Sequence, residues 1–402
     1  MIIRFGSSFV VVVMIRKWKR SEKQTWHALR QLEVQALPRR VGLPSSLQHL
    51  TFGYYFDGDL DGVALPEGLE TLDFGGKFNQ PIGRMAHPST LQDLSPSAPW
   101  PMENYFLPSN LRQLKFGFEF NQPIQHIVFP NSLSVLDLGQ AFDQSMEKVA
   151  LPSGLQTLQF GRAFNQRMEK VALPSGLQKL LFGHAFNHSM EMVALPSGLS
   201  DLTLYWGQSL EKVLLPSGLQ ILEIQGRSHG PMEQIAWPDG LRELYFSGCM
   251  GMALPSGLRL LDLGHEFNDS LEKVALPSGL QSLTIGDLFN QSIDKVALPS
   301  SLQSLTFGYD FDKSLEKVVL PSGLQDLALG PVFSHSMEMV ALPSGLQSLT
   351  FDCIIELGDY NPLEKVVLPN GLQELIVPSF LVTRHEREVR LPRCCEVLSS
   401  GF

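Results

Sequence analysis

The chain has 402 residues, of which 44% are hydrophobic and 18% are charged, and its formal net charge at pH 7 is −10. This balance is typical of an ordered protein with a buried core and excludes a disordered, low-complexity chain. The charge is unevenly distributed, because residues 1–40 contain nine Lys or Arg and two Asp or Glu, a net +7, which leaves −17 for residues 41–402.

The basic head, residues 1–40, is predicted to be an N-terminal cap segment. Its apolar run over residues 9–15 is shorter than the roughly 20 residues that a membrane-spanning helix needs. A cleaved signal peptide has its positive charge before the apolar run, whereas here most of the basic residues follow it. We therefore predict no transmembrane segment, and we favour a cap over peripheral contact with an anionic membrane.

From residue 41 onward the sequence repeats. Seventeen prolines, from Pro44 to Pro392, mark sixteen intervals, and eleven of these intervals are 22 residues long. A fixed period in this range is typical of a solenoid, in which each unit buries its apolar residues against its neighbours. We predict one elongated repeat domain over residues 41–392, of about 16 units, and a C-terminal tail over residues 393–402.

One unit, residues 276–297, shows how a coil would fold. Residues 277–279 are Pro-Ser-Gly, which favours a turn. Leu283 and Ile285 then alternate as the inward side chains of a short strand. The return limb, residues 293–298, has the same apolar spacing and is predicted to be extended. The fold class is therefore mainly β, a solenoid with a continuous parallel sheet on one face and extended or irregular return limbs.

Two columns of the repeat could be mistaken for a ligand site. We predict that the phenylalanines stack as a core spine and that the asparagines point inward and satisfy backbone groups at a corner of the coil. A metal ladder is the alternative for the asparagines, and we predict no metal and no cofactor. The predicted structural ladder comprises Phe120, Asn121, Phe164, Asn165, Phe186, Asn187, Phe267, Asn268, Phe289 and Asn290.

The repeated phrase resembles a known family. Phe-Asn-Gln-Pro-Ile at residues 78–82 and again at 120–124 is similar to the FNIP repeat, and the resemblance covers roughly residues 43–391. Later units lose the proline, as in Phe-Asn-Gln-Ser at residues 289–292. The resemblance implies a leucine-rich-repeat-like solenoid, no cofactor, no family active site and a role in protein interaction.

Some FNIP relatives join the array to an F-box, but residues 1–40 are too short and too basic to resemble one. A substrate-recognition array of a ubiquitin-ligase adaptor therefore stays an alternative. We predict that the chain is not an enzyme, because it contains no phosphate-binding glycine loop, no His-Glu-x-x-His motif and no nucleophile elbow.

The cysteines and sequons bear on the compartment. The four cysteines form no Cys-x-x-Cys pair and no repeated column, so we favour a cytoplasmic location over a secreted or cell-surface one. Three sequons, at Asn187, Asn268 and Asn290, would accept a glycan only in a secreted chain.

A partner is predicted to bind the outward positions of the strands. In regular units these positions are Ser and Thr, whereas the middle of the array is irregular, with intervals of 20 and 17 residues and varied side chains. The alternative is that these units have simply drifted. The candidate partner-binding residues are Lys179, Leu181, Asp201, Ile221, Glu223, Glu243, Tyr245 and Asp262.

The charge of the outward strand positions indicates the class of partner. Nine of them are Asp or Glu and two are Lys, a field that repels nucleic acid. We predict a monomeric, non-enzymatic scaffold for protein–protein interaction that binds a basic or neutral protein or peptide along this face. A secreted or cell-surface adhesion or structural array is the first alternative.

Overall fold

The computed structural model describes residues 12–14, 30–36, 42–58, 60, 63–78, 80, 87–96, 107–205, 210, 212–228, 235–248, 254–351, 363, 365–378 and 396–400. Most of the predicted cap segment (1–40), half of the predicted tail (393–402) and all four cysteines lie outside the described residues. The boundaries of these segments remain predictions.

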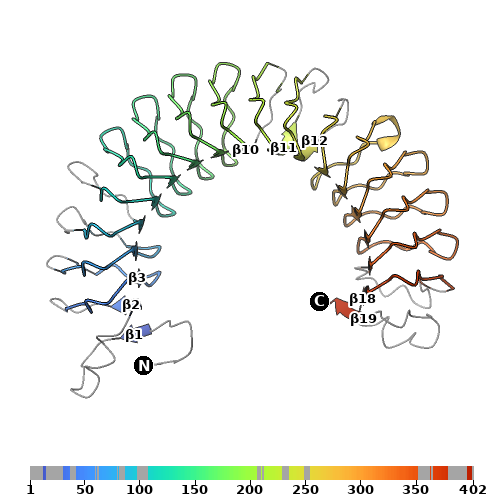
Figure 1. Ribbon diagram of the computed structural model, residues 1–402, viewed down its shortest axis with the longest axis horizontal. Helices are drawn as coiled ribbons and strands as arrows, with labels where there is room; N and C mark the ends of the chain where they lie inside the picture. The colour runs from blue at the N-terminus through green and yellow to red at the C-terminus, as the bar shows by residue number, and fades with distance from the viewer. Residues whose placement is uncertain are drawn as a thin grey trace. The chain divides into compact units, whose positions relative to one another are not determined.

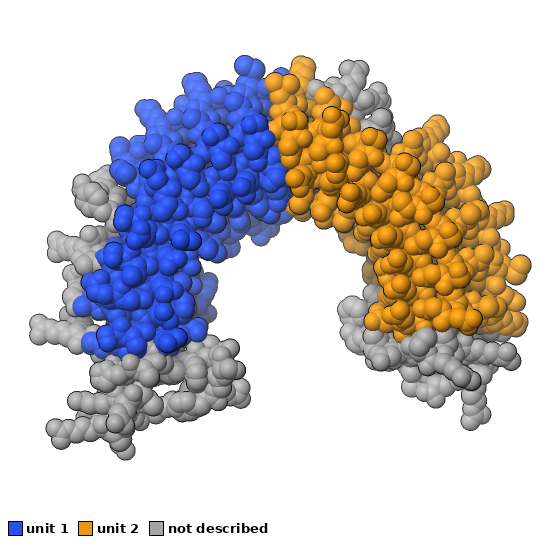
Figure 2. Space-filling view, in the orientation of Figure 1, with its two compact units in different colours: residues 1–205 blue, residues 206–402 orange. Residues whose placement is uncertain are grey.

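The chain divides into two compact units, residues 1–205 (unit 1) and residues 206–402 (unit 2), which Figure 2 shows in different colours. Each unit is a succession of coils, and each coil contributes one short strand to a parallel sheet (Figure 1). Among the described residues, no helix has the length and apolar character needed to cross a bilayer.

Unit 1 is built from in-register parallel strands. Each strand pairs with the next one along the chain, from β1–β2 to β9–β10. Its strands are β1 (Val12–Met14), β2 (Gln31–Ala36), β3 (His49–Phe52), β4 (Thr71–Asp73), β5 (Asp93–Ser95), β6 (Gln113–Lys115), β7 (Val135–Asp137), β8 (Thr157–Gln159), β9 (Lys179–Leu181) and β10 (Asp201–Tyr205).

Unit 2 follows the same rule, with parallel pairs from β11–β12 to β18–β19. A short 3-10 helix, η2 (Leu271–Lys273), occupies one return limb. The strands are β11 (Ile221–Ser228), β12 (Glu243–Gly248), β13 (Leu260–Asp262), β14 (Ser282–Ile285), β15 (Ser304–Phe307), β16 (Asp326–Leu329), β17 (Ser348–Phe351), β18 (Glu374–Pro378) and β19 (Glu396–Ser400).

The core lies inside the coils. In the reference unit Leu283 and Ile285 on β14 are fully buried, and Phe289 and Ile293 close the coil from the other side. The corner phenylalanines are buried and stack on one another, with ring centroids 6.1 Å apart between Phe120 and Phe142 in unit 1. Within each unit the predicted mainly-β solenoid, with a parallel sheet on one face, is confirmed.

Three hydrogen-bonded turns reverse the chain in the regular coils among the described residues, one of them at the corner phenylalanine, where the Phe164 amide donates to the Gly161 carbonyl (3.3 Å). In the Pro-Ser-Gly turn the Leu155 amide donates to the Pro152 carbonyl (3.1 Å), as predicted from the turn residues. The return limb differs from the expected extended limb, because it contains a second turn of the same kind: Val149 donates to Met146 (3.1 Å) and Val296 to Ile293 (3.0 Å). A Glu-Lys pair, such as Glu147 and Lys148, lies at the tip of this turn, which explains why both side chains are exposed.

Glycine after the strand lets adjacent coils approach closely. A Cβ atom added at Gly161 would lie 1.9 Å from the backbone oxygen of Gly139 in the preceding coil. At Gly286 in unit 2 the equivalent distance, to the oxygen of Gly264, is 1.5 Å. No side chain fits at such a distance, so Gly161 and Gly286 cannot be replaced without a shift of the backbone.

We predict that Gly161→Ala destabilises the chain by about 3 kcal/mol, because the clash is with rigid backbone rather than with a flexible side chain. The matched control is Gly176→Ala in the same unit, where the added Cβ meets its nearest atom at 3.4 Å. Urea unfolding followed by circular dichroism compares the two variants. Equal stability of both would contradict the close approach.

Candidate interaction surface

The asparagine column joins neighbouring coils at a corner. The Asn165 side-chain oxygen accepts a hydrogen bond from the Asn187 amide (3.0 Å), and the Asn268 oxygen accepts from the Asn290 amide (2.9 Å). The side chains differ from the expectation in one respect, since the column is exposed or half-buried rather than inward. The bonds run along the surface, from one coil to the next.

The third residue of the Phe-Asn-Gln phrase uses the same acceptor. The Gln144 side-chain amide donates to the Asn121 oxygen (2.9 Å), and Gln291 donates to Asn268 (3.1 Å). Only an acceptor oxygen is needed from the middle position, so Asp can replace Asn there. Among the described residues, no three His, Cys, Asp or Glu side chains gather as a set able to hold a metal ion.

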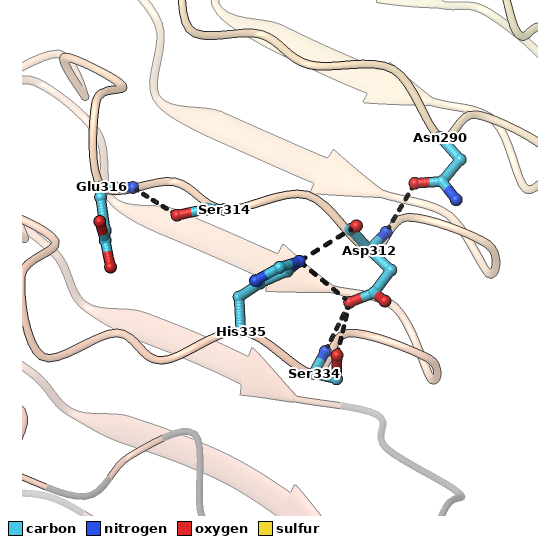
Figure 3. A network of polar contacts seen from close by, with 6 residues as sticks. All are labelled: Asn290, Asp312, Ser314, Glu316, Ser334 and His335. Atoms are coloured by element: carbon cyan, nitrogen blue, oxygen red, sulfur yellow. Dashed lines mark hydrogen bonds and ion pairs between the residues drawn. The ribbon is translucent and has the colours of Figure 1, made fainter.

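Asp312 shows this replacement at close range (Figure 3). Its amide donates to the Asn290 oxygen (3.1 Å), and its carboxylate accepts from the Ser334 amide (2.9 Å) and the Ser334 hydroxyl (2.8 Å). His335 approaches the same carboxylate at 3.6 Å and the Asp312 carbonyl oxygen at 3.2 Å. The side chains of this corner therefore join one coil to the backbone of the next. The strand face is left as the candidate interaction surface.

On the strand face of unit 1 the acidic residues have basic neighbours. Lys179 on β9 lies directly opposite Asp201 on β10, and the ammonium group is 2.6 Å from the carboxylate. Burial raises the pKa of Asp93 and of Asp137, while the positive charge of Lys115 opposes the shift in both. The charges of these five coils are therefore partly balanced within the chain.

Leu181 lies on β9 opposite Thr203 on β10, and the other five candidate residues lie in unit 2. The register places Glu223 on β11, Tyr245 on β12 and Asp262 on β13 side by side, and we call these three residues the Tyr245 row. One row earlier, Glu243 lies between Ile221 and Leu260. All of these side chains are half-buried.

Hydrogen bonds hold the polar groups of this surface in place. The Tyr245 hydroxyl donates to the Glu243 carboxylate (3.1 Å), and the Asp262 carboxylate accepts from the Gly264 amide (2.8 Å). Gly264 has a positive φ of 63°, which allows the tight bend after the strand. The Glu223 carboxylate accepts a hydrogen bond from the Gln225 side chain.

The charged groups acting on the Tyr245 row are negative. Burial raises the pKa of Asp262, the Gly264 amide opposes that shift, and the negative charges of Asp287 and Glu223 add to it. Burial also raises the pKa of Tyr245, together with its bond to Glu243 and the charges of Glu243, Asp262 and Glu223. The charges that shift the pKa values of Asp262 and Tyr245 are therefore all negative, which gives this part of the face a negative potential.

Two nearby side chains that can carry positive charge contact other groups. The Arg242 guanidinium donates to the carbonyl oxygens of Asp239 (2.9 Å) and Leu241 (3.1 Å), in the turn before β12. His265 is 2.7 Å from the Asp287 carboxylate at the next corner. This His–Asp pair was not predicted from the sequence, although the 22-residue spacing of the two residues places them in adjacent coils.

Comparison with known proteins identifies the repeats. The FNIP Repeat model matches residues 38–76, 101–141, 142–185, 164–206, 252–288, 267–310, 289–331 and 311–353, which is more than half of the chain. The chain belongs to the FNIP-repeat family. The predicted resemblance to the FNIP repeat is confirmed, and the matched ranges include residues 120–124.

One solved structure supports a leucine-rich-repeat fold for these FNIP repeats. CroV588, described as a novel circular leucine-rich-repeat protein, is 27% identical with a TM-score of 0.58, and the match covers 93% of this chain and 73% of that one. YopM from Yersinia enterocolitica is 21% identical with a TM-score of 0.47, over 93% of this chain and 83% of that one. A comparison with curated proteins gave no match.

We predict that Asp312→Ala lowers the free energy of unfolding of the FNIP array by about 1–2 kcal/mol, because the Ser334 amide and hydroxyl lose their shared acceptor. Asp312→Asn keeps an acceptor oxygen and should retain most of the stability. Chemical denaturation of both variants and the native chain measures the difference. If the Asn variant were as unstable as the Ala variant, the charge rather than the acceptor would hold this corner.

A second prediction concerns pH. The pKa of Asp262 in the folded chain lies above the ordinary value of 3.8, so its ionisation disfavours folding and the penalty grows as pH rises through the folded-state pKa. Asp262→Asn removes the charge and can still accept from Gly264. We expect a higher melting temperature for the variant at pH 7 and a smaller difference at pH 4. An equal difference at both pH values would contradict the electrostatic cause.

Proposed function

We propose that this FNIP array is a non-enzymatic scaffold that binds a basic protein or peptide on the strand face, with the Tyr245 row and Glu243 at the centre. The family and the fold support a solenoid of the leucine-rich-repeat type. The observation that supports this location is the negative potential on β11–β13, where Asp262 and Tyr245 are influenced only by other acidic groups among their charged neighbours.

Physical complementarity supports a basic partner. A group of carboxylates attracts cationic segments and repels phosphate backbones. Tyr245 adds an aromatic ring, and Ile221 and Leu260 add apolar contact area beside Glu243. Aromatic residues and desolvated charges at the centre of a patch are typical of the positions that dominate binding energy.

The unit 1 candidates have a different role in this proposal. The Lys179 ammonium group already neutralises Asp201, and the Asp201 side chain is only 16% exposed. A partner's cation would have to displace this ion pair. We therefore propose that Lys179, Leu181 and Asp201 contribute little to partner binding. The residues of unit 2 supply most of the binding energy.

The test is a charge reversal on the strand face. The double variant Glu223→Lys/Glu243→Lys is compared with Glu316→Lys/Glu338→Lys, which makes the same change of charge on the exposed turns of the return limbs in unit 2. Each tagged full-length chain captures proteins from native lysate, and quantitative mass spectrometry compares the captured proteins. Circular dichroism and thermal melting first establish that all chains fold.

We expect a protein held by the native chain and by the return-limb variant to be lost by at least about tenfold with the strand-face variant, a change of about 1.4 kcal/mol. Equal capture by both variants would place the binding surface elsewhere. Equal loss from both would show that net charge alone causes capture. A native chain that captures nothing specific would contradict the scaffold function.

A further inference from the structure

The Tyr245 row presents an aromatic ring between two carboxylates. Glu223 and Asp262 each lie one strand away from Tyr245, on opposite sides, at the spacing of about 4.8 Å that separates strands in any sheet. The Tyr245 hydroxyl is bonded to Glu243, the residue two positions earlier on the same strand. This bond orients the ring along its own strand and fixes a third carboxylate beside it.

This row differs from the outward positions of the other described strands in unit 2. The next outward rows on β14 and β15 contain Ser and Thr, such as Ser304 and Thr306, with no charge and no ring. Asp326 on β16 has a carboxylate, but the residues opposite it on β15 and β17 are Ser304 and Ser348. The combination of ring and flanking carboxylates is therefore local to β11–β13 among the described strands of this unit.

We propose that the Tyr245 row is a seat for the guanidinium group of an arginine, presented by an extended basic segment of the partner protein. This inference rests on the proposed function and specifies the chemistry by which the partner is recognised. The guanidinium stacks on the Tyr245 ring, and its N–H groups donate to the Glu223 and Asp262 carboxylates on either side. The partner's flanking residues cover Ile221 and Leu260.

Arginine fits this seat better than lysine for geometric reasons. A guanidinium is planar and has five N–H donors, so it can stack on a ring and bond to carboxylates in its own plane at the same time. An ammonium group is compact and more strongly hydrated, and it loses more solvation when it approaches a half-buried ring. Charge-assisted hydrogen bonds to carboxylates are also stronger than neutral ones.

The partner's arginine would also relieve the repulsion within the surface. The carboxylates of Glu223 and Asp262 act on each other and on the Tyr245 hydroxyl, and Asp287 adds a further negative charge. A cation placed among them replaces unfavourable interactions with favourable ones. The surface is thus complementary in charge and shape to one kind of side chain.

The experiment uses a fluorescein-labelled peptide of alternating glycine and arginine that contains three arginines. Fluorescence anisotropy measures its binding to the full-length chain at low salt. Two matched peptides replace every arginine by lysine or by citrulline, which has nearly the shape of arginine and no charge. We expect the arginine peptide to bind most tightly, the lysine peptide more weakly and the citrulline peptide not measurably.

Variants of the chain locate the binding. Asp262→Asn and Glu223→Gln are each expected to weaken binding of the arginine peptide by about tenfold, because each removes one charge-assisted partner. Asp326→Asn removes the same charge from an outward strand position without a ring nearby, and it should change affinity less than twofold, an effect of about 0.4 kcal/mol. Tyr245→Leu should abolish the preference for arginine over lysine.

Each result is decisive. Asp262→Asn is expected to raise stability, so weaker binding by this variant cannot be attributed to unfolding. An equal loss with Asp326→Asn would overturn the proposal, since binding would then follow net charge alone. Equal affinity for the citrulline peptide, or no binding of the arginine peptide to the native chain, would also overturn it. In the latter case a partner still captured through the strand face would leave the scaffold function intact.

Discussion

The in-register pairing of adjacent coils is the constraint on which the rest of the structure depends. Parallel backbone hydrogen bonds hold each strand about 4.8 Å from the next, and the 22-residue period brings each residue opposite its counterpart, as Leu283 lies opposite Leu305. A residue type that recurs in one column of the repeat must therefore tolerate contact with another copy of itself. Glycine after the strand, the stacked corner phenylalanines and the hydrogen-bonded asparagines each satisfy this requirement in a different way.

Some charged residues satisfy the same constraint by pairing with an opposite charge in the next coil. Identical charges at 4.8 Å repel one another, whereas opposite charges in adjacent coils attract. Lys179 and Asp201 occupy the same column in successive coils and form an ion pair. On the return limbs, Lys170 approaches Glu147 at 4.0 Å and Lys295 approaches Glu272 at 3.6 Å, each pair joining one coil to the next. These exposed pairs favour register and solubility more than stability.

The sequence predicted the period, the inward leucines and the Pro-Ser-Gly turn, because these depend on backbone chemistry that repeats in every coil. It did not predict the second turn at Val149, since the spacing of apolar residues is the same for a strand and for a turn that buries both ends. It also placed the asparagines inward, although Asn268 is exposed. A single-sequence pattern shows which residues recur, but the direction of a polar side chain depends on the neighbouring coil.

The candidate surface was predicted from irregular spacing together with aromatic and charged residues, and the structure adds a physical reason to propose it. A coil with Ser at its outward positions, such as Ser304, has no unfavourable contact with the coils beside it. The coils containing Glu223, Tyr245 and Asp262 do, because the charge of Glu223 acts on Asp262, and the charges of Glu223 and Asp262 act on Tyr245, at half-buried positions. Such an arrangement disfavours the isolated fold and favours the complex with a cation. A local cost in stability of this kind is typical of a binding surface.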